Sequence, residues 1–474
     1  MLRATQRKMG QKTLSTRLKK TSSSNSRDSD NGKASKGVQC RQVMILGLIA
    51  TFVFAVWIVV FETNVFGTRD GISSTIKPSN ANANIHVNSN SDTDPLSHYQ
   101  AGRNTIYVSI ATLGDHACPI TVNDLFKKAR YPQNIYVGIY QQNEPTDPDC
   151  LSMLDQCGAV SENSQHRQII DGTASNLGDI TTLCMMREHI AINRTNIALG
   201  AKGPVYGRYM SMKLLGTKQT DFICMIDSHT LFRDNWDDYT IQMWFGIEPD
   251  YRHAVLTHYP WGAEHLEKRT KEGNEYSYHI CGSVYEGAPN FMVRNANGCF
   301  AKNAAKPVRV PFFAGGFSFA ATEFWNLVPL DPYLLYIFNG EEFDVATRGW
   351  THGYDFYSPN TDIVGHYYDK GPRRRSPHVG SNQESHALRD KSEKRLNYMW
   401  GLWNIRYPEW KDLSLQEIGQ KAELRELDKY GLGDKRTLQA FWKFAGINPI
   451  SKNITIWKEE LWANGGLEYV PYKR

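Results

Sequence analysis

The chain has 474 residues, of which 41% are hydrophobic and 12% aromatic, so it is long enough for one large or two ordinary domains with a sizeable core. Residues 1–42 contain eleven Lys and Arg residues and two acidic residues, a net +9, so the remaining chain carries about −4 of the overall +5. The basic character therefore belongs to the N-terminal segment, which argues against nucleic-acid binding by the rest of the chain.

The N-terminal region predicts a membrane anchor. Residues 1–42 are rich in Ser, Lys and Arg, which is typical of a disordered tail. Val43–Phe61 is an uncharged apolar run of 19 residues, long enough to span a bilayer. The basic residues precede it, so the positive-inside rule places the N-terminus in the cytosol and the rest of the chain in the lumen. The alternative is a buried core helix. Residues 62–103 are polar and predict a flexible stalk.

The cysteines predict disulfides, because a lumenal compartment permits them. Seven of the eight cysteines follow the apolar run, so at least one of the seven stays free. We expect this to be Cys224, which lies in an apolar run typical of a buried strand. Cys150 and Cys157 are close enough in sequence for a short disulfide loop, although pairing cannot be derived from sequence. No closely spaced cysteine pair indicates zinc.

Strands and helices alternate from Thr105 onward, which predicts an α/β sheet. Thr105–Thr112 and Asn134–Tyr140 have the composition of buried strands, and Pro119–Ala129 between them has helical spacing. This strand–helix–strand unit implies parallel pairing with a right-handed crossover.

The alternation continues along the chain. The further expected elements are a helix over Gly203–Leu215, strands over Phe222–Ile226, Ala254–Tyr259 and Phe313–Ala321, a short acidic helix over Gly340–Gly349, and helical spacing in Leu413–Leu427. We expect one α/β domain over residues 104–450 and a C-terminal extension over residues 451–474.

The most informative stretch is the end of the strand that begins at Phe222, where Asp227-Ser228-His229 follows a wholly apolar run. Alternate residues of a strand project the same way, so Asp227 and His229 point together. Ligands in open α/β sheets bind beyond the carboxyl ends of the strands, and a carboxylate with an imidazole there suits a divalent cation and a phosphate. The alternative is an Asp that caps the next helix beside an ordinary surface His.

Four other stretches contain candidate functional residues, and each has a purely structural alternative. Gly315-Gly316 indicates close approach by a ligand or another backbone, or a bulge. Glu341, Glu342 and Asp344 open the acidic helix, where they face a substrate hydroxyl or complement the helix dipole. His366 is a metal ligand or a structural histidine. The run Lys370–Arg375 holds phosphates or is a solvated loop.

The order of these features resembles that of metal-dependent nucleotide-sugar transferases with the GT-A fold. Those enzymes have an acidic metal motif at a strand end, then a glycine loop, an acidic pair opening a helix, and a late His. The corresponding residues here are Asp227/His229, Gly315/Gly316, Glu341/Glu342 and His366.

Longer motifs make the resemblance closer. The chain resembles the family of GlcNAc-transferases that modify polypeptide hydroxyls, including hydroxyproline-directed enzymes of social amoebae and mucin-initiating enzymes of trypanosomes. The matching stretches are IYVSIAT (106–112), CPITVNDLFKKARYP (118–132), GIYQQ (138–142), GPVYGRY (203–209), MIDSHTLF (225–232), NWD (235–237), GGFSFA (315–320), GEEFDVATRGWTHGYDFYSP (340–359), HYYDKG (366–371) and YGLGDKRTLQAFWKFAGINP (430–449). Residues 261–307 match no stretch of the family, and one interpretation is that they shape the acceptor groove.

The resemblance implies a metal site and a donor. Asp227, His229 and His366 would be the metal ligands, and Mn²⁺ (or Mg²⁺) would bridge the phosphates of UDP-GlcNAc. An imidazole in place of the second carboxylate of the usual Asp-x-Asp motif favours manganese over calcium. The residues expected near the nucleotide and phosphates are Ser109, Gln141, Arg167, Arg208, Asp227, Gly315 and Gly316.

The resemblance also implies retention of anomeric configuration without a dedicated base, so the candidate catalytic carboxylates Glu341, Glu342 and Asp344 would orient the acceptor hydroxyl or the sugar.

The expected protein is a single-pass type II Golgi glycosyltransferase that moves GlcNAc to a Ser, Thr or hydroxyproline hydroxyl of a polypeptide. The alternatives are a relative that uses UDP-glucose or UDP-galactose, and an inactive relative that binds glycans or tethers partners in the Golgi. A metal hydrolase is disfavoured, because the chain has no HExxH or paired-metal motif.

Overall fold

The computed structural model describes residues 95–157 and 180–454, apart from short gaps at 217, 249, 273–275, 281, 287–291, 297, 303–304, 369–371, 373–374, 376–379 and 381. The predicted tail, the predicted anchor over Val43–Phe61 and nearly all of the predicted stalk lie outside these residues. Within them, none of the helices combines the length and the apolar character needed to cross a membrane.

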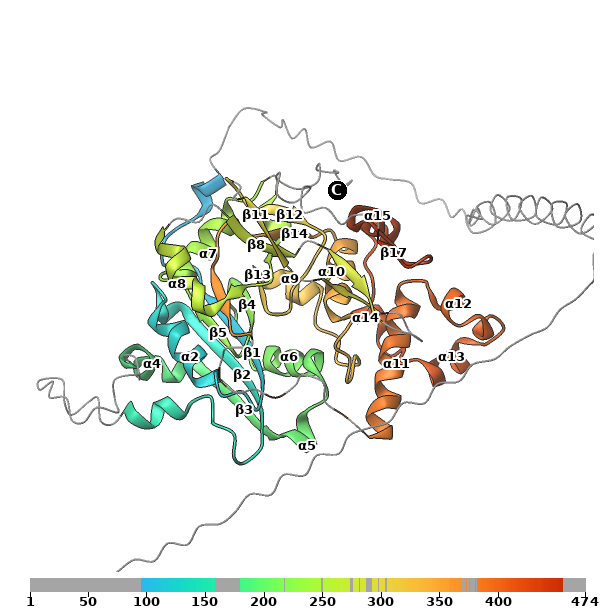
Figure 1. The fold of residues 1–474 in the computed structure, drawn as a ribbon, viewed down its shortest axis with the longest axis horizontal. Coiled ribbons are helices and arrows are strands. Elements are labelled where there is room, and N and C mark those ends of the chain that lie inside the picture. The colour runs from blue at the N-terminus through green and yellow to red at the C-terminus, as the bar shows by residue number, and fades with distance from the viewer. Residues whose placement is uncertain are drawn as a thin grey trace, which may run out of the picture. The chain divides into compact units, whose positions relative to one another are not determined.

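An eight-stranded mixed sheet forms the centre of the domain (Figure 1), which confirms the α/β prediction. Its strands, in spatial order, are β12 (Val308–Val310), β14 (Asp355–Ser358), β6 (Ala254–Thr257), β13 (Phe317–Ala321), β4 (Phe222–Asp227), β1 (Ile106–Leu113), β2 (Ile135–Asn143) and β3 (Ile190–Asn196). The four strands from β4 to β3 are mutually parallel, and β13 runs antiparallel to both β4 and β6. The carboxyl ends of the parallel strands therefore meet at one edge.

Smaller sheets flank the central one. Three short strands, β5 (Thr230–Phe232), β15 (Val364–His366) and β7 (Trp261–Gly262), form one of them. The two-stranded pairs are β9 (Ser283–Tyr285) with β10 (Val293–Asn295), β8 (Tyr276–Ile280) with β11 (Gly298–Lys302), and β16 (Ile447–Asn448) with β17 (Asn453–Ile454).

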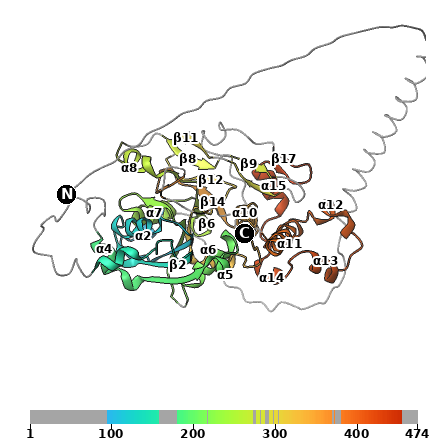
Figure 2. The same cartoon turned by 60° about the horizontal axis from the view of Figure 1, so that its bottom comes forward.

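Helices cover the sheet and extend the domain to one side. They are α2 (Cys118–Lys127), α4 (Thr181–Met185), α5 (Ile197–Gly200), α6 (Pro204–Lys213), α7 (Trp236–Phe245), α8 (Ala263–Glu272), α9 (Thr322–Leu327), α10 (Glu341–Thr351), α11 (Gln383–Met399), α12 (Trp403–Arg406), α13 (Leu415–Lys421), α14 (Leu427–Tyr430) and α15 (Leu438–Ala445). In Figures 1 and 2, α11, α12 and α13 lie at the end of the domain remote from β2 and α2.

Two hydrophobic layers, one on each face of the sheet, form the core. Val108 and Ile110 of β1 pack with Phe126 of α2 in one layer, whereas Tyr107 packs with Val205 of α6 in the other. This alternation follows from the two-residue period of a strand. Full burial of such side chains stabilises the fold by about 1.5–3 kcal/mol each, so both layers hold the strand ends in place.

The predicted elements agree with the structure except at some ends. Gly203 has a φ of +96°, which suits glycine and places the start of α6 at Pro204. The strand expected over Phe313–Ala321 begins only at Phe317, so the two glycines precede the strand and do not interrupt it. Within the helical spacing of Leu413–Leu427 the structure has the short helix α13, and a second short helix, α14, begins at Leu427.

Two disulfides, Cys118–Cys150 and Cys157–Cys184, are present, so the predicted Cys150–Cys157 loop is wrong. Cys118 opens α2 and lies beside the segment that follows β2, with a Cα–Cα distance of 4.9 Å to Cys150. The disulfide pairing thus depends on tertiary packing, which the spacing of cysteines in the sequence does not show. Among the described residues Cys224 is the free cysteine, as predicted, and it is buried in β4.

Candidate active site

Asp227 is the last residue of β4 and lies opposite Ala111 of β1, at the carboxyl edge of the parallel strands. The chain then turns through Ser228 and His229 into β5. Strand β15 pairs with β5 so that His366 lies opposite Thr230, and the Tyr367 N–H donates to the His229 carbonyl at 2.9 Å. The small three-stranded sheet is therefore what carries His366 to the end of β4.

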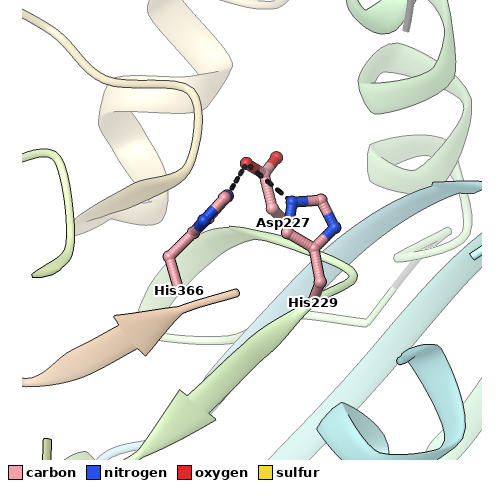
Figure 3. A group of neighbouring side chains, drawn as sticks. All are labelled: Asp227, His229 and His366. Atoms are coloured by element: carbon pink, nitrogen blue, oxygen red, sulfur yellow. Dashed lines mark ion pairs between the residues drawn. The ribbon is translucent and has the colours of Figure 1, made fainter. Parts of the chain in front are cut away.

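Three side chains converge at this edge (Figure 3). Asp227 Oδ2 lies 3.3 Å from His366 Nε2 and 3.9 Å from His229 Nε2, and one ligand atom from each residue falls within 4.8 Å of the others. Ligand atoms around one transition-metal ion lie roughly 3 Å apart, because each is about 2 Å from the ion. One carboxylate oxygen and two imidazole nitrogens form a donor set that suits a transition metal. The three residues fit such an ion.

Asp115 orients His229, and the sequence analysis did not identify it. Its Oδ2 accepts from His229 Nδ1 at 2.6 Å and from the Ser228 hydroxyl at 2.7 Å, and its Oδ1 accepts from the Ala117 N–H at 2.9 Å. Burial alone would raise the pKa of Asp115, but the hydrogen bonds from His229, Ser228 and Ala117 lower it. With the proton on Nδ1, His229 Nε2 presents its lone pair toward Asp227.

Arg208 of α6 joins Asp227 to the acidic helix. Its Nη2 lies 2.8 Å from Asp227 Oδ1, and its Nη1 donates to Glu341. Burial alone would raise the pKa of Asp227, but the hydrogen bond from His366 and the charge of Arg208 hold that pKa well below its usual range. Burial raises the pKa of Glu341 despite the contact with Arg208. The structure thus places one guanidinium between two carboxylates.

The paired glycines leave room for these groups. A Cβ atom on Gly315 would lie 2.6 Å from Arg208 Nη1, and one on Gly316 would lie 3.1 Å from Asp227 Oδ2. The first distance is far below van der Waals contact, so a side chain at Gly315 would displace the guanidinium. Close approach by a functional side chain, and not a bulge within the strand, therefore accounts for the glycines.

Glu342, at the start of α10, accepts three hydrogen bonds. Its Oε2 accepts from the Tyr259 hydroxyl at 2.7 Å and from Asn295 Nδ2 at 2.9 Å, and its Oε1 accepts from the Gly315 N–H at 3.1 Å. Burial raises the pKa of Glu342 to about 7. Tyr259 follows β6, and Asn295 belongs to the region that sequence motifs left unassigned. The contacts of Tyr259 and Asn295 with Glu342 are visible only in the tertiary structure.

Two cavities meet at Asp227. The first, of about 480 Å³, lies beyond the ends of β1 and β2 and is lined among others by Thr112, Gln142, Pro204 and Arg375. The second, of about 540 Å³, is lined among others by Tyr259, Glu286, Arg294, Asn295, Glu341 and Glu342. Both are lined by Arg208, Asp227, Phe338, His366 and Tyr368. Such an arrangement suits two substrates that react beside one ion.

Residues 105–451, most of the chain, match the model of a family described as Glycosyltransferase (GlcNAc). The chain belongs to this glycosyltransferase family. Membership in this family agrees with the predicted glycosyl-transfer class.

One curated relative and two solved structures are similar to parts of this chain. N-acetylgalactosaminyltransferase 6 of Drosophila melanogaster is 31% identical over 100 residues, which are 21% of this chain and 14% of the fly protein. A solved GalNAc-T7 with UDP, GalNAc and Mn²⁺ has a TM-score of 0.44 at 15% identity, over 73% of this chain and 57% of that one. A mannosyltransferase from Pyrobaculum calidifontis with GDP-Man and Mn²⁺ has a TM-score of 0.33 at 12% identity, over 69% and 79% respectively. The chain thus spans a small part of its curated relative.

Several predicted site residues of the glycosyltransferase do not line the two cavities. The Ser109 hydroxyl lies 2.6 Å from the Ser211 hydroxyl beneath α6, and Gln141 bonds Asp149 and the Cys150 N–H. Neither Ser109 nor Gln141 lines either of the two cavities, whereas the neighbouring Thr112 and Gln142 line the first. Ser109 and Gln141 thus face away from the first cavity, and their assignment to the nucleotide stays a prediction.

Asp344, a predicted catalytic residue, also lies away from the two cavities. Its carboxylate pairs with Arg348 at 3.1 Å, one turn along α10, and burial raises its pKa to about 6. The side chain lies within the core, away from both cavities. Arg167, expected near the nucleotide, lies outside the described residues.

Proposed function

We propose that this glycosyltransferase has the GT-A fold and transfers GlcNAc from UDP-GlcNAc, with Mn²⁺ (or Mg²⁺), to a Ser, Thr or hydroxyproline hydroxyl of a polypeptide. The observation that carries the proposal is the convergence of Asp227, His229 and His366 where two cavities meet: Asp227 and His366 line both cavities, and His229 lines the first. Family membership supports the sugar class.

Asp227, His229 and His366 would hold the cation. When bound there, it would neutralise the negative charge that develops on the departing diphosphate. Arg208 lies beside the same carboxylate, at the boundary of the two cavities, where a guanidinium suits a phosphate. The first cavity, at the carboxyl ends of β1 and β2, is the proposed nucleotide site.

The second cavity is the proposed site of the sugar and the acceptor. In a retaining transfer, the acceptor oxygen bonds to the anomeric carbon as the bond from that carbon to the phosphate oxygen breaks, and the acceptor proton passes to the leaving phosphate. No base is then required. Glu341 is paired with Arg208, and Glu342 accepts three hydrogen bonds, so both carboxylates suit orientation of substrate hydroxyls.

The assignments of the donor sugar and of the acceptor rest on the family resemblance. The resemblance to hydroxyproline-directed and mucin-initiating enzymes favours GlcNAc and a polypeptide, and UDP-glucose or UDP-galactose donors are the nearest alternatives. We also propose a Golgi location with the catalytic domain in the lumen, held by the apolar run Val43–Phe61. Two disulfides agree with an oxidising compartment.

The test is release of UDP from a panel of UDP-sugars by the full chain, with Ser/Thr- and hydroxyproline-containing peptides, with and without EDTA. We expect peptide-stimulated release with UDP-GlcNAc that EDTA abolishes. Asp227→Asn should lower it at least about a hundredfold, because it weakens the metal set. Asp234→Asn, at an exposed carboxylate paired with Lys128, is the matched control and should retain activity.

Activity that survives EDTA and Asp227→Asn would contradict the metal site. Thermal stabilisation by Mn²⁺ and UDP without any transfer would favour an inactive binding protein instead.

A further inference from the structure

The strands β9 and β10 form part of the wall of the second cavity, and they come from the region that matches none of the family motifs. They pair antiparallel, with Ser283 opposite Asn295 and Tyr285 opposite Val293. Glu286, directly after β9, and Arg294 of β10 both line the cavity on the side of Glu342. This wall is therefore placed to contact whatever enters beside the acidic helix.

The strands are fixed to the site. Asn295 Nδ2 donates to Glu342 at 2.9 Å and to the Phe313 carbonyl at 2.7 Å, while Met292 and Val293 are buried in the core. These contacts hold β10 at a constant position relative to Glu342. Arg294 of this strand is thus held at a fixed position relative to the proposed reaction centre.

Glu286 and Arg294 form an ion pair, and each side chain keeps one polar atom that bonds no other described residue. Arg294 Nε donates to Glu286 Oε1, and Arg294 Nη1 donates to the Asn295 carbonyl at 2.9 Å. Glu286 Oε2 and Arg294 Nη2 make no bond to another described residue. The side chains are 42% and 37% exposed, so the pair itself adds little stability. The cavity wall thus presents an acceptor and a donor side by side.

We propose that Glu286 and Arg294 bind the backbone of the acceptor polypeptide next to the hydroxyl that is glycosylated. A residue in an extended segment presents its own N–H donor and C=O acceptor on the same side, which matches a carboxylate beside a guanidinium. Sugar hydroxyls donate and accept alike and do not require this polarity. The Glu286–Arg294 pair is neutral overall, so it binds the peptide backbone and does not select peptides by their net charge. The inference rests on the proposed function and specifies how its acceptor is held.

The experiment compares Glu286→Ala and Arg294→Ala with the wild-type full chain on one acceptor peptide and on versions N-methylated at single positions. We expect KM for the peptide to rise about tenfold in either variant with kcat within about twofold, since each variant loses one charge-assisted hydrogen bond. One N-methyl position should weaken binding to the wild type about tenfold and add nothing in Glu286→Ala. Glu248→Ala, which breaks an exposed pair with Lys306, is the matched control.

Release of UDP without acceptor separates the two proposals. It requires the donor and the metal site but no peptide, and it should be unchanged in Glu248→Ala, whose residue lines neither cavity. Unchanged KM, or equal N-methyl effects in wild type and Glu286→Ala, would overturn the backbone contact while the transferase assignment stands. Transfer only to glycosides would overturn both the backbone contact and the polypeptide acceptor, and only the transferase assignment would stand. Failure of the wild type to release UDP from any donor would overturn both.

Discussion

His229 forms a pair with the buried Asp115, in which Nδ1 of the imidazole lies 2.6 Å from the carboxylate Oδ2. The two residues come from different strand ends, since Asp115 follows β1 and His229 follows β4. The pair fixes the tautomer of the imidazole and turns its Nε2 toward Asp227. Asp115 is thus a positioning residue for the proposed metal ligands.

Asp115→Asn should weaken Mn²⁺ binding about 10–100-fold, because an amide holds the imidazole less firmly in the required tautomer. The measurement is a Mn²⁺ titration of full-length protein, followed by the metal dependence of UDP release. Excess Mn²⁺ should restore much of the rate. A lower rate at saturating Mn²⁺ with unchanged affinity would instead place Asp115 outside metal positioning.

Gly315→Ala should lower activity and destabilise the fold by about 1–3 kcal/mol, because the new Cβ would lie 2.6 Å from Arg208 Nη1 in a packed site. Gly419→Ala is the control, since Gly419 lies in helix α13 and a Cβ added there would meet no atom within 4 Å. That substitution should stabilise the helix by up to about 1 kcal/mol. Urea denaturation and UDP release measure both effects. Equal behaviour of the two variants would contradict the close approach of Arg208.

Sequence predicted the parts of the site that lie within one short run of residues. An apolar strand that ends in Asp-Ser-His indicated both the end of β4 and the metal candidates. The position of His366 followed from the family order of motifs, and the structure explains it by the pairing of β15 with β5. Local pattern and motif order were sufficient there.

Sequence did not show which way a side chain faces at the end of a strand or on a helix. Ser109 and Gln141 lie on strands that do end at the site, but their side chains bond Ser211 and Asp149. A difference of one residue along a strand reverses the face, so Gln142 lines the cavity and Gln141 does not. Asp344 is likewise on the correct helix, but it turns toward Arg348.

Glu342→Gln should change how stability depends on pH. Burial raises the pKa of Glu342 to about 7 from an ordinary value near 4.5, so the folded state binds the proton more tightly than the unfolded state. Stability from this group is present below about pH 4.5 and is lost as pH rises toward 7. The free energy of unfolding of the wild type should therefore fall relative to Glu342→Gln by about 2 kcal/mol across that range. Urea titrations at several pH values measure the difference, and parallel curves would contradict the raised pKa.

Removal of the Cys118–Cys150 disulfide should destabilise the domain and the first cavity together. The two cysteines are 32 residues apart, so loss of the cross-link should cost about 3–4 kcal/mol in the chain-entropy account. The disulfide also holds the segment that contains Asp147, which pairs with Arg375 on the wall of the first cavity at 3.1 Å.

The double variant Cys118→Ala/Cys150→Ala should therefore melt at lower temperature and bind UDP more weakly than the wild type. Cys224→Ala is the control: it removes the buried free thiol of β4 but leaves both disulfides intact. Thermal melts with and without reductant distinguish the two variants, because the reductant should lower the Tm of Cys224→Ala more than that of the double variant. An equal effect of reductant on both would contradict the Cys118–Cys150 pairing.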